Sequence, residues 1–584
     1  MEKKKPVINC HTHIFTGDHV PPFLAKTFVP SPLHYLFPLS LIVKLFRFWY
    51  NYPYTWQFKP WYKKIKEILY RINMFGARTG SGRLISSVIG LFLTIQVFYI
   101  LFDWFSLIGK PNAGTVESIT DLRTWLDEHW LLFIPHSFVG KALFILALIL
   151  FFKPGRNILL LLLKKVWSFL GVLPGPQTKE LAKRYLNIGR FAFYKEQTRV
   201  FGRLKNQYPD GTGFVVLPMD MEYMGAGKLK KEYRYANQMA ALKAIKNNPQ
   251  NKDVIFPFVF AEPRRFVDEG KAHFDYEISN GSVKLNDCFI KEYIEDNKFS
   301  GFKIYPALGY YPFDEALLPL WKYAADNGLP ILTHCIRGTI YYRGNKKRAW
   351  DKHPVFEQVS GDGEYDSLLL MEINNRDFIN NFTHPLNYLC LLDERLLRKL
   401  VQKAKSDRIS ELFGYTDDQT PLKYNLKHLK LCFGHFGGDD EWHKFLEADR
   451  DNYASQLVRN PTHGISFLED EEGNPSRGKP EQIWKYVDWY SIICSMMLQS
   501  PNVYADLSYI IHSSDIQPLL KQTLFNDKLK ERVLFGTDFY VVRNHKSEKN
   551  MLIDVTDHLS EQEFDQIART NPRTFLSTVI HGKI

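Results

Sequence analysis

Histidine and aspartate side chains stand where several short apolar runs of this chain end. The five residues are His11, His13, His334, His435 and Asp538, in the motifs CHTH, LTH, FGHFGG and FGTD. Imidazole and carboxylate groups are suitable ligands for Zn²⁺, Mn²⁺ or Fe²⁺. A single histidine at the end of a strand is more often structural. Four such motifs in a consistent order, however, indicate a metal centre.

The apolar runs themselves predict eight β-strands with helical patterns between them. They are Pro6–His11, Gly213–Met219, Val254–Phe260, Gly301–Tyr305, Pro330–His334, Leu429–Gly434, Val503–Leu507 and Val533–Gly536. Strands that alternate with helices indicate βαβ units and a parallel sheet. Eight of them predict a (β/α)8 barrel of the TIM type, whose active site lies at the C-terminal ends of the strands.

Side chains alternate along a strand, so His11 and His13 are expected on one side, facing the barrel mouth. By the same alternation, Cys10, Cys335 and Cys432 should face the outer helices. We therefore interpret these cysteines as small buried hydrophobic residues and not as metal ligands.

The order H-x-H, strand lysine, T-H, G-H-x-G-G and G-T-D resembles the amidohydrolase superfamily. The similarity is greatest to its amidohydrolase-related branch, which includes aminocarboxymuconate-semialdehyde decarboxylase and other metal-dependent hydrolases. It covers residues 1–20 and about 200–584. The segments Thr383-His384-Pro385-Leu386 and Asn571-Pro572-Arg573 also look like that branch.

This resemblance implies a ligand set for one divalent metal, with Zn²⁺ the expected ion: His11, His13, His334 and Asp538. It implies that His435 is an acid/base histidine beside the metal or a ligand of a second metal. Lys303 lies where some members of the superfamily carry a carboxylated lysine that bridges two metals. The branch mostly works with one metal, however, and a strand lysine can simply pair with an acid.

The expected activity is hydrolysis of a small molecule. A metal at an open site lowers the pKa of water toward 7 and polarises a carbonyl group. Asp538 would then carry the proton and His435 would stabilise the oxyanion. Non-oxidative decarboxylation stays open as an alternative, because the same centre could help to protonate a substrate carbon. A non-catalytic, membrane-bound scaffold is a third hypothesis, and the complete ligand set argues against it.

A basic segment follows the fifth predicted strand and begins near Arg337. Loops on this face of a barrel select the substrate. Arg337 is therefore a candidate for binding a substrate carboxylate or phosphate through paired hydrogen bonds. A solvated basic loop explains the segment equally well.

Between the first two strands lies a hydrophobic insertion, residues 21–176, which we expect to divide the barrel into residues 1–20 and 177–584. Ile85–Phe102 is a run of 18 residues without a charge, and Trp130–Phe152 is a run of 23 residues. A bilayer core needs about 20 mostly apolar residues as a helix. The insertion therefore predicts two transmembrane helices, at about 84–108 and 130–152.

The charges around these runs predict an orientation. Lys59–Arg83 and Lys153–Arg184 each contain seven basic residues and one acid, whereas the connection Asp103–His129 contains five acids and two basic residues. By the positive-inside rule, the barrel would lie in the cytoplasm, anchored to the membrane. Membrane lipid would then be a partner, and amphipathic substrates become plausible. A helical cap or a homo-oligomer interface is the alternative.

The composition agrees with a folded, cytosolic enzyme. The chain has 584 residues, 45% of them hydrophobic, which excludes wholesale disorder. Its six cysteines show no paired spacing, and this predicts reduced thiols. The net charge of +12 concentrates beside the apolar runs, where it suits anionic headgroups. We therefore expect no nucleic-acid partner.

Overall fold

The computed structural model describes most of the chain. It covers residues 5–26, 32–36, 38–57, 59–108, 113–133, 137–151, 183, 185–187, 194–338, 340–361, 363–370, 380–447, 452–470 and 472–582. Two compact units divide the chain: Met1–Arg47 with Glu180–Ile584, and Phe48–Lys179. Residues 152–176 of the expected insertion lie outside the described ranges, and its boundaries at residues 20 and 176 stay predictions.

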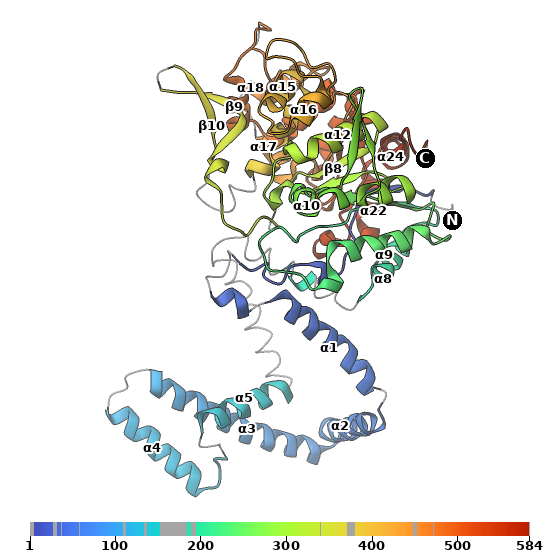
Figure 1. Ribbon diagram of the computed structural model, residues 1–584. Helices are drawn as coiled ribbons and strands as arrows, with labels where there is room; N and C mark the ends of the chain where they lie inside the picture. Colours follow the sequence, from blue (N-terminus) through green and yellow to red (C-terminus); the bar gives the residue numbers. More distant parts are fainter. Residues whose placement is uncertain are drawn as a thin grey trace. The chain divides into compact units, whose positions relative to one another are not determined.

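Eight parallel strands form a ring in the larger unit. Helices such as α9 (Tyr235–Asn247), α12 (Leu318–Asn327) and α22 (Glu548–His558) lie around the strands (Figure 1). In ring order they are β1 (Ile8–Thr12), β2 (Gly213–Val216), β3 (Ile255–Pro257) continued by β4 (Val259–Phe260), β7 (Phe302–Ile304), β8 (Pro330–His334), β11 (Lys430–Gly434), β12 (Val503–Asp506) and β13 (Val533–Leu534). Each paired neighbour runs parallel.

Backbone hydrogen bonds close the ring between β13 and β1. The N–H of Cys10 donates to the carbonyl of Phe535 at 2.8 Å, and the N–H of Asp538 donates to the carbonyl of His11 at 2.9 Å. The N–H of Phe258, between β3 and β4, donates to the carbonyl of Val216 at 3.0 Å and keeps that part of the ring continuous. The predicted (β/α)8 barrel is therefore confirmed.

The remaining elements of this unit surround the strands. The helices are α8 (Gln197–Lys205), α10 (Pro263–Glu269), α11 (Phe289–Lys291), α14 (Leu389–Leu392), α15 (Glu394–Gln402), α16 (Asp407–Phe413), α17 (Asp439–Leu446), α18 (Asn452–Arg459), α19 (Lys479–Tyr486), α20 (Trp489–Gln499), α21 (Gln517–Phe525), α23 (Glu561–Asp565) and α24 (Asn571–Leu576). Two antiparallel hairpins, β5 (Tyr276–Ser279) with β6 (Ser282–Leu285) and β9 (Lys352–Val359) with β10 (Tyr365–Leu369), complete it.

Local sequence explains several helix starts. The Asp393 carboxylate caps α15 by accepting from the N–H groups of Arg395 and Leu396, and the Asp488 carboxylate caps α20 by accepting from the N–H of Ser491. Such side chains satisfy backbone donors that have no partner within the helix.

The core consists of two layers. Alternate strand residues pack with the helices, whereas the other set forms a separate cluster inside the ring. This inner cluster contains Ile8, Cys10, Val215, Leu217, Phe256, Phe258, Leu332, Cys432, Tyr504 and Leu534, with Phe575 and Leu576 of α24. Cys335 packs in the outer layer, as expected, but the predicted outward orientation of Cys10 and Cys432 was wrong.

A β-bulge in β1 explains why the side chain of Cys10 faces the inside of the barrel. Asn9 pairs with Phe214 and Thr12 pairs with Val216, so β1 has one residue more than β2 between these two pairs. An extra residue breaks the alternation of side chains. Cys10 can therefore face the inner cluster although His11 also points into the ring. For Cys432, counting back from His435 was misleading, because His435 lies beyond the strand with a left-handed φ of 66°.

The smaller unit is helical and does not support the membrane prediction. Together with the adjoining α1 (Leu39–Gln57), its helices are α2 (Pro60–Arg78), α3 (Gly80–Ile108), α4 (Ala113–Glu128) and α5 (Phe138–Phe151). In the described ranges, no helix combines the length and the apolar character that a membrane span requires. The prediction of two transmembrane helices was therefore wrong. The multi-pass membrane localisation with a cytoplasmic barrel, which rested on it, is also contradicted.

The structure shows where the apolar runs differ from spanning helices. Trp130–Phe152 is not one helix, because residues 131–133 are non-helical and α5 has 14 residues. At 1.5 Å per residue, α5 is about 21 Å long, less than the roughly 30 Å of a bilayer core. In α3, which covers the whole of Ile85–Phe102, the Gln96 side chain is buried. It donates to the carbonyl of Leu131 and accepts from the N–H of Phe133 at 2.7 Å.

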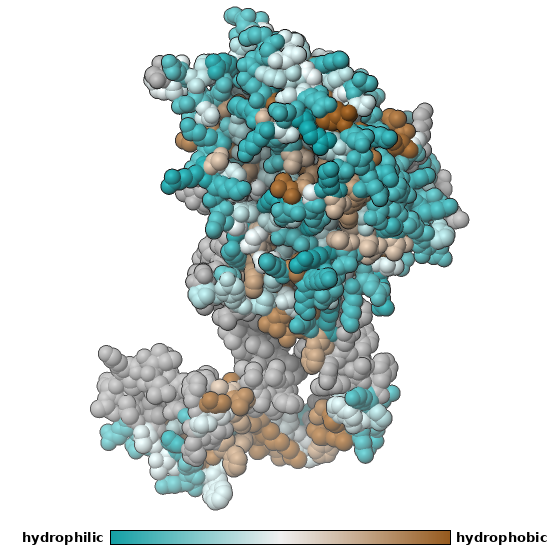
Figure 2. Space-filling view, in the orientation of Figure 1, coloured by the Kyte–Doolittle hydropathy of each residue, from teal (hydrophilic) through white to brown (hydrophobic). Residues whose placement is uncertain are grey.

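Apolar side chains of this unit are exposed, among them Trp61, Ile72, Leu84 and Val88. Figure 2 shows the corresponding brown surface on the described part of residues 48–179. Patches of this kind usually mark a contact surface.

The close approach of β7 and β8 gives a stability prediction. A Cβ on Gly301 would lie 2.4 Å from the carbonyl oxygen of Pro330, a backbone atom that cannot move aside. Gly301→Ala should lower the free energy of unfolding by about 2 kcal/mol in urea titrations. Gly202→Ala in α8 is the control, because its Cβ meets nothing within 4 Å. That helical substitution should raise stability by about 0.5–1 kcal/mol. Equal stability of the two variants would contradict the predicted clash.

Candidate active site

A pocket of about 70 Å³ lies at the C-terminal ends of the strands. Its polar residues are His13, Asn187, His334, His435 and Asp538. Its other residues are Phe15, Val20, Met219, Met221, Tyr305, Ile340, Tyr540 and Val541. Apart from Asn187, these residues lie at or just after the C-terminal ends of β1, β2, β7, β8, β11 and β13. The pocket is therefore at the catalytic end of a (β/α)8 barrel.

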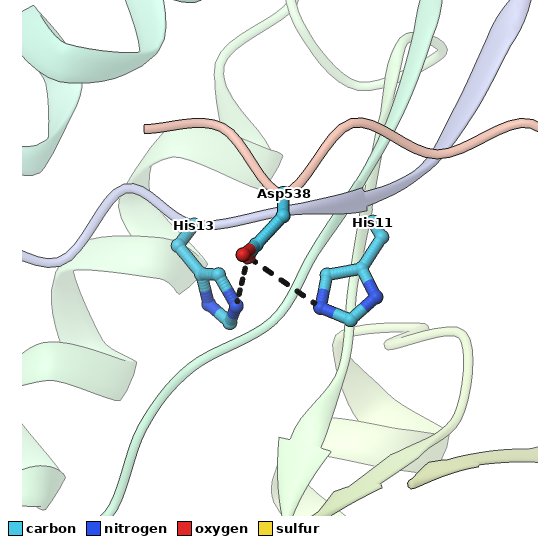
Figure 3. A group of neighbouring side chains, drawn as sticks. All are labelled: His11, His13 and Asp538. Atoms are coloured by element: carbon cyan, nitrogen blue, oxygen red, sulfur yellow. Dashed lines mark ion pairs between the residues drawn. The ribbon is translucent and has the colours of Figure 1, made fainter. Parts of the chain in front are cut away.

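His11, His13 and Asp538 converge at this end of the barrel (Figure 3). One carboxylate oxygen of Asp538, Oδ1, lies 3.3 Å from Nε2 of His13 and 3.8 Å from Nε2 of His11. All three residues are buried, and Asp538 has a left-handed φ of 62°, which is uncommon outside glycine. The turn after β13 therefore aims this carboxylate at the two histidines of β1.

The hydrogen bonds of the two rings fix where their protons lie. Nδ1 of His13 is 2.9 Å from the carbonyl of Leu217, and Nδ1 of His11 is 2.9 Å from the carboxylate of Asp506. Both partners only accept, so each ring carries a proton on Nδ1, and the neutral form of each ring has its lone pair on Nε2.

The group therefore fits a cation. Two Nε2 lone pairs face a carboxylate with no proton between them, and the buried Nε2 of His11 has no hydrogen-bond partner among the residues that the structure describes. Two ligands of a tetrahedral Zn²⁺ at about 2.1 Å are about 3.4 Å apart, close to the separations seen here. His11, His13 and Asp538 could hold a divalent metal.

Asp506, at the end of β12, was not among the predicted site residues, yet it organises the site. Its carboxylate accepts from Nδ1–H of His11 at 2.9 Å, from the N–H of His435 at 3.1 Å and from the N–H of Ser508 at 3.0 Å. Burial by itself would raise the pKa of this carboxyl. The favourable contacts with His11, His435 and Ser508 outweigh burial and hold the pKa well below its usual value.

A second metal beside Asp506 is not favoured by this geometry. His11, His435 and Asp506 are close enough to share an ion, but the Ser508 hydroxyl lies 3.0 Å from Nδ1 of His11 and 2.9 Å from Nδ1 of His435. It also donates to Asp506. The Ser508 hydroxyl occupies the space that an ion would need. His11, His435 and Asp506 are therefore connected by hydrogen bonds through Ser508 and not by a second metal.

His334 lies beside the triad and contacts His435. Its Nδ1 is 3.0 Å from Nε2 of His435, and its ring stacks on Tyr305 with centroids 3.8 Å apart. Burial, together with the neighbouring His11, lowers the pKa of His435 to about 3, so that its ring is neutral. The structure thus places all five predicted histidine and aspartate residues at one site, although His334 is outside the closest group.

Lys303 and Arg337 differ in their placement. Lys303 points into the barrel from β7 and is fully buried, and within the described part of the chain its Nζ has no hydrogen-bond partner. Burial lowers its pKa to about 8, against the opposing effect of Asp506 and Asp538. Arg337 is not among the pocket residues. It forms an ion pair with the buried Glu441 at 3.0 Å, so its predicted substrate contact stays a prediction.

A buried polar network stabilises the seam between β1 and β13. Glu548 accepts from the hydroxyls of Tyr208 at 2.6 Å and Thr537 at 2.8 Å. Asn9 donates to both hydroxyls and accepts from the N–H of His11 at 3.2 Å. These residues support the backbone that carries His11 and Asp538.

Sequence reasoning missed this network and the contacts of Asp506. The spacing within VYADLS could have predicted the position of Asp506 and Ser508. They come two and four residues after Tyr504, which faces the inside of the barrel, and alternate residues of a strand lie on the same side. No spacing rule identifies Glu548, which comes from a helix.

Fold and site together define a (β/α)8-barrel protein with a buried His-His-Asp group able to hold a metal at the C-terminal ends of its strands. No protein-family model and no curated protein matches the chain.

Three solved structures are similar in architecture. The first is 5-carboxyvanillate decarboxylase from Novosphingobium aromaticivorans, complexed with manganese and a nitrobenzoic acid (13% identity, 70% of this chain, 86% of that chain, TM-score 0.33). The others are an uncharacterised TIM-barrel protein from Bordetella bronchiseptica (11%, 70%, 88%, 0.30) and an amidohydrolase from Burkholderia multivorans with bound HEPES (11%, 67%, 91%, 0.31). With TM-scores this low, the fold assignment rests on the strand pairing.

The buried Glu548 gives a pH prediction. Burial raises its pKa from 4.5 to about 7, so its contribution to stability is complete below about pH 4.5 and is lost as the pH rises through about 7. Glu548→Gln cannot ionise. Between pH 4.5 and 7.5 its unfolding free energy should therefore rise relative to wild type, by on the order of 3 kcal/mol. Urea titrations across this range test the slope. Glu277→Gln, at an exposed position, controls for loss of a charge and should show no such trend.

Proposed function

We propose that this protein is a metal-dependent hydrolase of the amidohydrolase type that acts on a small molecule. The observation that supports this most is the arrangement of His11, His13 and Asp538, whose facing acceptor atoms have no proton between them.

In this proposal the three residues hold one divalent metal, and His334 is the expected fourth ligand. Nitrogen and carboxylate donors suit Zn²⁺, and Mn²⁺ also accepts them. When bound, such an ion supplies Lewis-acid chemistry that polarises a carbonyl and makes water more acidic.

Asp538 is the proposed proton carrier. Burial would raise the pKa of this carboxyl, but the adjacent rings of His13, His435 and His11 outweigh burial and hold the pKa below the ordinary value. The carboxylate is therefore ionised near neutral pH and can accept a proton from water. His435 is neutral and lines the same pocket, and we assign it the second acid/base role.

The pocket wall favours hydrolysis over decarboxylation. Among its described residues, none is lysine or arginine, and most are apolar. A substrate for decarboxylation carries a carboxylate, for which the described wall offers no cation besides the proposed metal. A neutral ester, amide or lactone with a small apolar group suits this wall better. Lipid and a second copy of the chain, the other expected partners, are not supported, because the exposed apolar side chains of α2 and α3 indicate a contact surface without identifying what binds there.

Product analysis tests the reaction class. Metal-loaded protein would be incubated with neutral esters, amides and lactones, and separately with aromatic carboxylic acids. We expect hydrolysis in the first set and no CO₂ release in the second. CO₂ release without hydrolysis would establish decarboxylation instead.

Removing both histidines of β1 should abolish metal binding. Elemental analysis of wild-type protein should find about one divalent metal per chain, and His11→Ala with His13→Ala should contain almost none. The barrel should stay folded, because the site lies at the loop end of the strands. A control that replaces the exposed His428 and His558 should keep its metal. Stoichiometric metal in the His11/His13 variant would refute the ligand assignment.

Asp538→Asn separates metal binding from proton transfer. An amide oxygen can still face the metal but cannot take up a proton, so turnover should fall by about 10³-fold or more while partial metal binding remains. Steady-state kinetics and metal analysis on the same sample measure both effects. Asp515→Asn, at an exposed position, is the control for charge. Near-normal turnover in Asp538→Asn would transfer the proton-carrying role to His435.

A further inference from the structure

Asp506 and Ser508 lie side by side at the end of β12, between two histidines with different expected roles. His11 belongs to the metal triad, whereas His435 is the acid/base candidate. Asp506 and Ser508 are both fully buried, and neither belongs to the triad or lines the pocket. Their polar atoms are engaged with the histidines, with each other and with backbone N–H groups.

The number of available protons determines how these groups are connected. An ionised Asp506 only accepts, so His11 must donate through Nδ1–H and the Ser508 hydroxyl must donate its single proton to the carboxylate. The Ser508 oxygen can then only accept from the two rings. Nδ1 of His435 must therefore carry a proton, which also suits the Ser508 carbonyl 3.2 Å away.

The same order extends to His334. With its proton on Nδ1, a neutral His435 has a lone pair on Nε2. That atom is 3.0 Å from Nδ1 of His334, which must in turn be the donor. The Nε2 atom of His334 is then the acceptor nitrogen of its ring.

Two glycines leave room for the His11 ring and the Ser508 side chain. A Cβ on Gly536 would lie 3.0 Å from Cβ of His11 and 3.2 Å from Cβ of Ser508, and a Cβ on Gly434 would lie 3.1 Å from the ring of His11. The ends of β11 and β13 therefore carry no side chain where the His11 ring and the hydroxyl pack.

We propose that Asp506 and Ser508 are positioning residues that set one proton order, with protons on Nδ1 of His11, His435 and His334, so that the Nε2 atoms are the acceptors. The link to metal affinity rests on the proposed function, whereas the proton order is a property of the metal-free chain. Partners of this kind typically change metal affinity by about 10–100-fold.

Ser508→Ala and Asp506→Asn test the proposal by chelator competition with Zn²⁺. We expect both variants to bind Zn²⁺ about 10–100-fold more weakly than wild type. Ser495→Ala and Asp488→Asn are matched controls, since these buried residues make hydrogen bonds away from the site: Asp488 caps the start of α20, and Ser495 bonds within α20 and accepts from the N–H of Ile465. Both controls should bind Zn²⁺ within about twofold of wild type. Thermal melting verifies folding, and Ser508→Ala, which removes only one oxygen, decides the result if Asp506→Asn does not fold.

NMR of metal-free, ¹⁵N-histidine-labelled protein reads the proton order directly. We expect Nδ1–H tautomers for His11, His334 and His435 in wild type. Ser508→Ala should alter the signals of His435 and His334, whereas His13, bonded to the Leu217 carbonyl, should not change. Nε2–H tautomers in wild type, or unchanged tautomers and affinities in both variants, would overturn the proposal. If wild-type protein binds no metal, the proposed function fails, and these spectra still decide the proton order.

Discussion

The seam between the last and the first strand is the constraint on which the candidate site depends. His11 and His13 belong to β1 and Asp538 follows β13, so the three side chains meet only when the ring closes. Across this seam, Asn9 bonds to Thr537, 528 positions further along the chain. Chain entropy opposes contacts between such distant segments until the intervening structure has formed. The site is therefore a product of the complete barrel and not of a local motif.

The bulge in β1 also affects the site, because it determines which side chains of this strand point into the barrel. A regular strand would alternate Cys10 and His11 between the two faces of the sheet. With the extra residue between Asn9 and Thr12, Cys10 fills the inner cluster while His11 still reaches Asp506 and Asp538. One short strand thus supplies both a side chain for the apolar core and the histidine of the candidate metal site. Left-handed backbone at His435 and Asp538 similarly directs residues just past the strand ends toward the same point.

Much of this architecture could be predicted from the sequence, because buried strands are apolar runs and polar side chains at their ends are conspicuous. The eight strands and the convergence of His11, His13, His435 and Asp538 follow from that pattern. The orientation of Cys10 could not be predicted, because a bulge has no composition of its own. Asp506 and Glu548 were inconspicuous because their partners are distant in sequence. Hydropathy also failed in the Trp130–Phe152 run, since an apolar run does not determine whether a single helix covers it.

The charges of the site link its chemistry to its stability. Asp506 and Asp538 are both buried and have pKa values below the ordinary value, so two negative charges lie close together beside neutral rings. Lys303 is the buried cation that acts on both, and burial lowers its own pKa to about 8. Buried charges are costly unless they are paired. A divalent cation between His11, His13 and Asp538 would more than offset the remaining negative charge. In this chain, metal binding and folding should therefore be coupled, because the metal would bind beside the buried carboxylates whose charges are costly to bury without it.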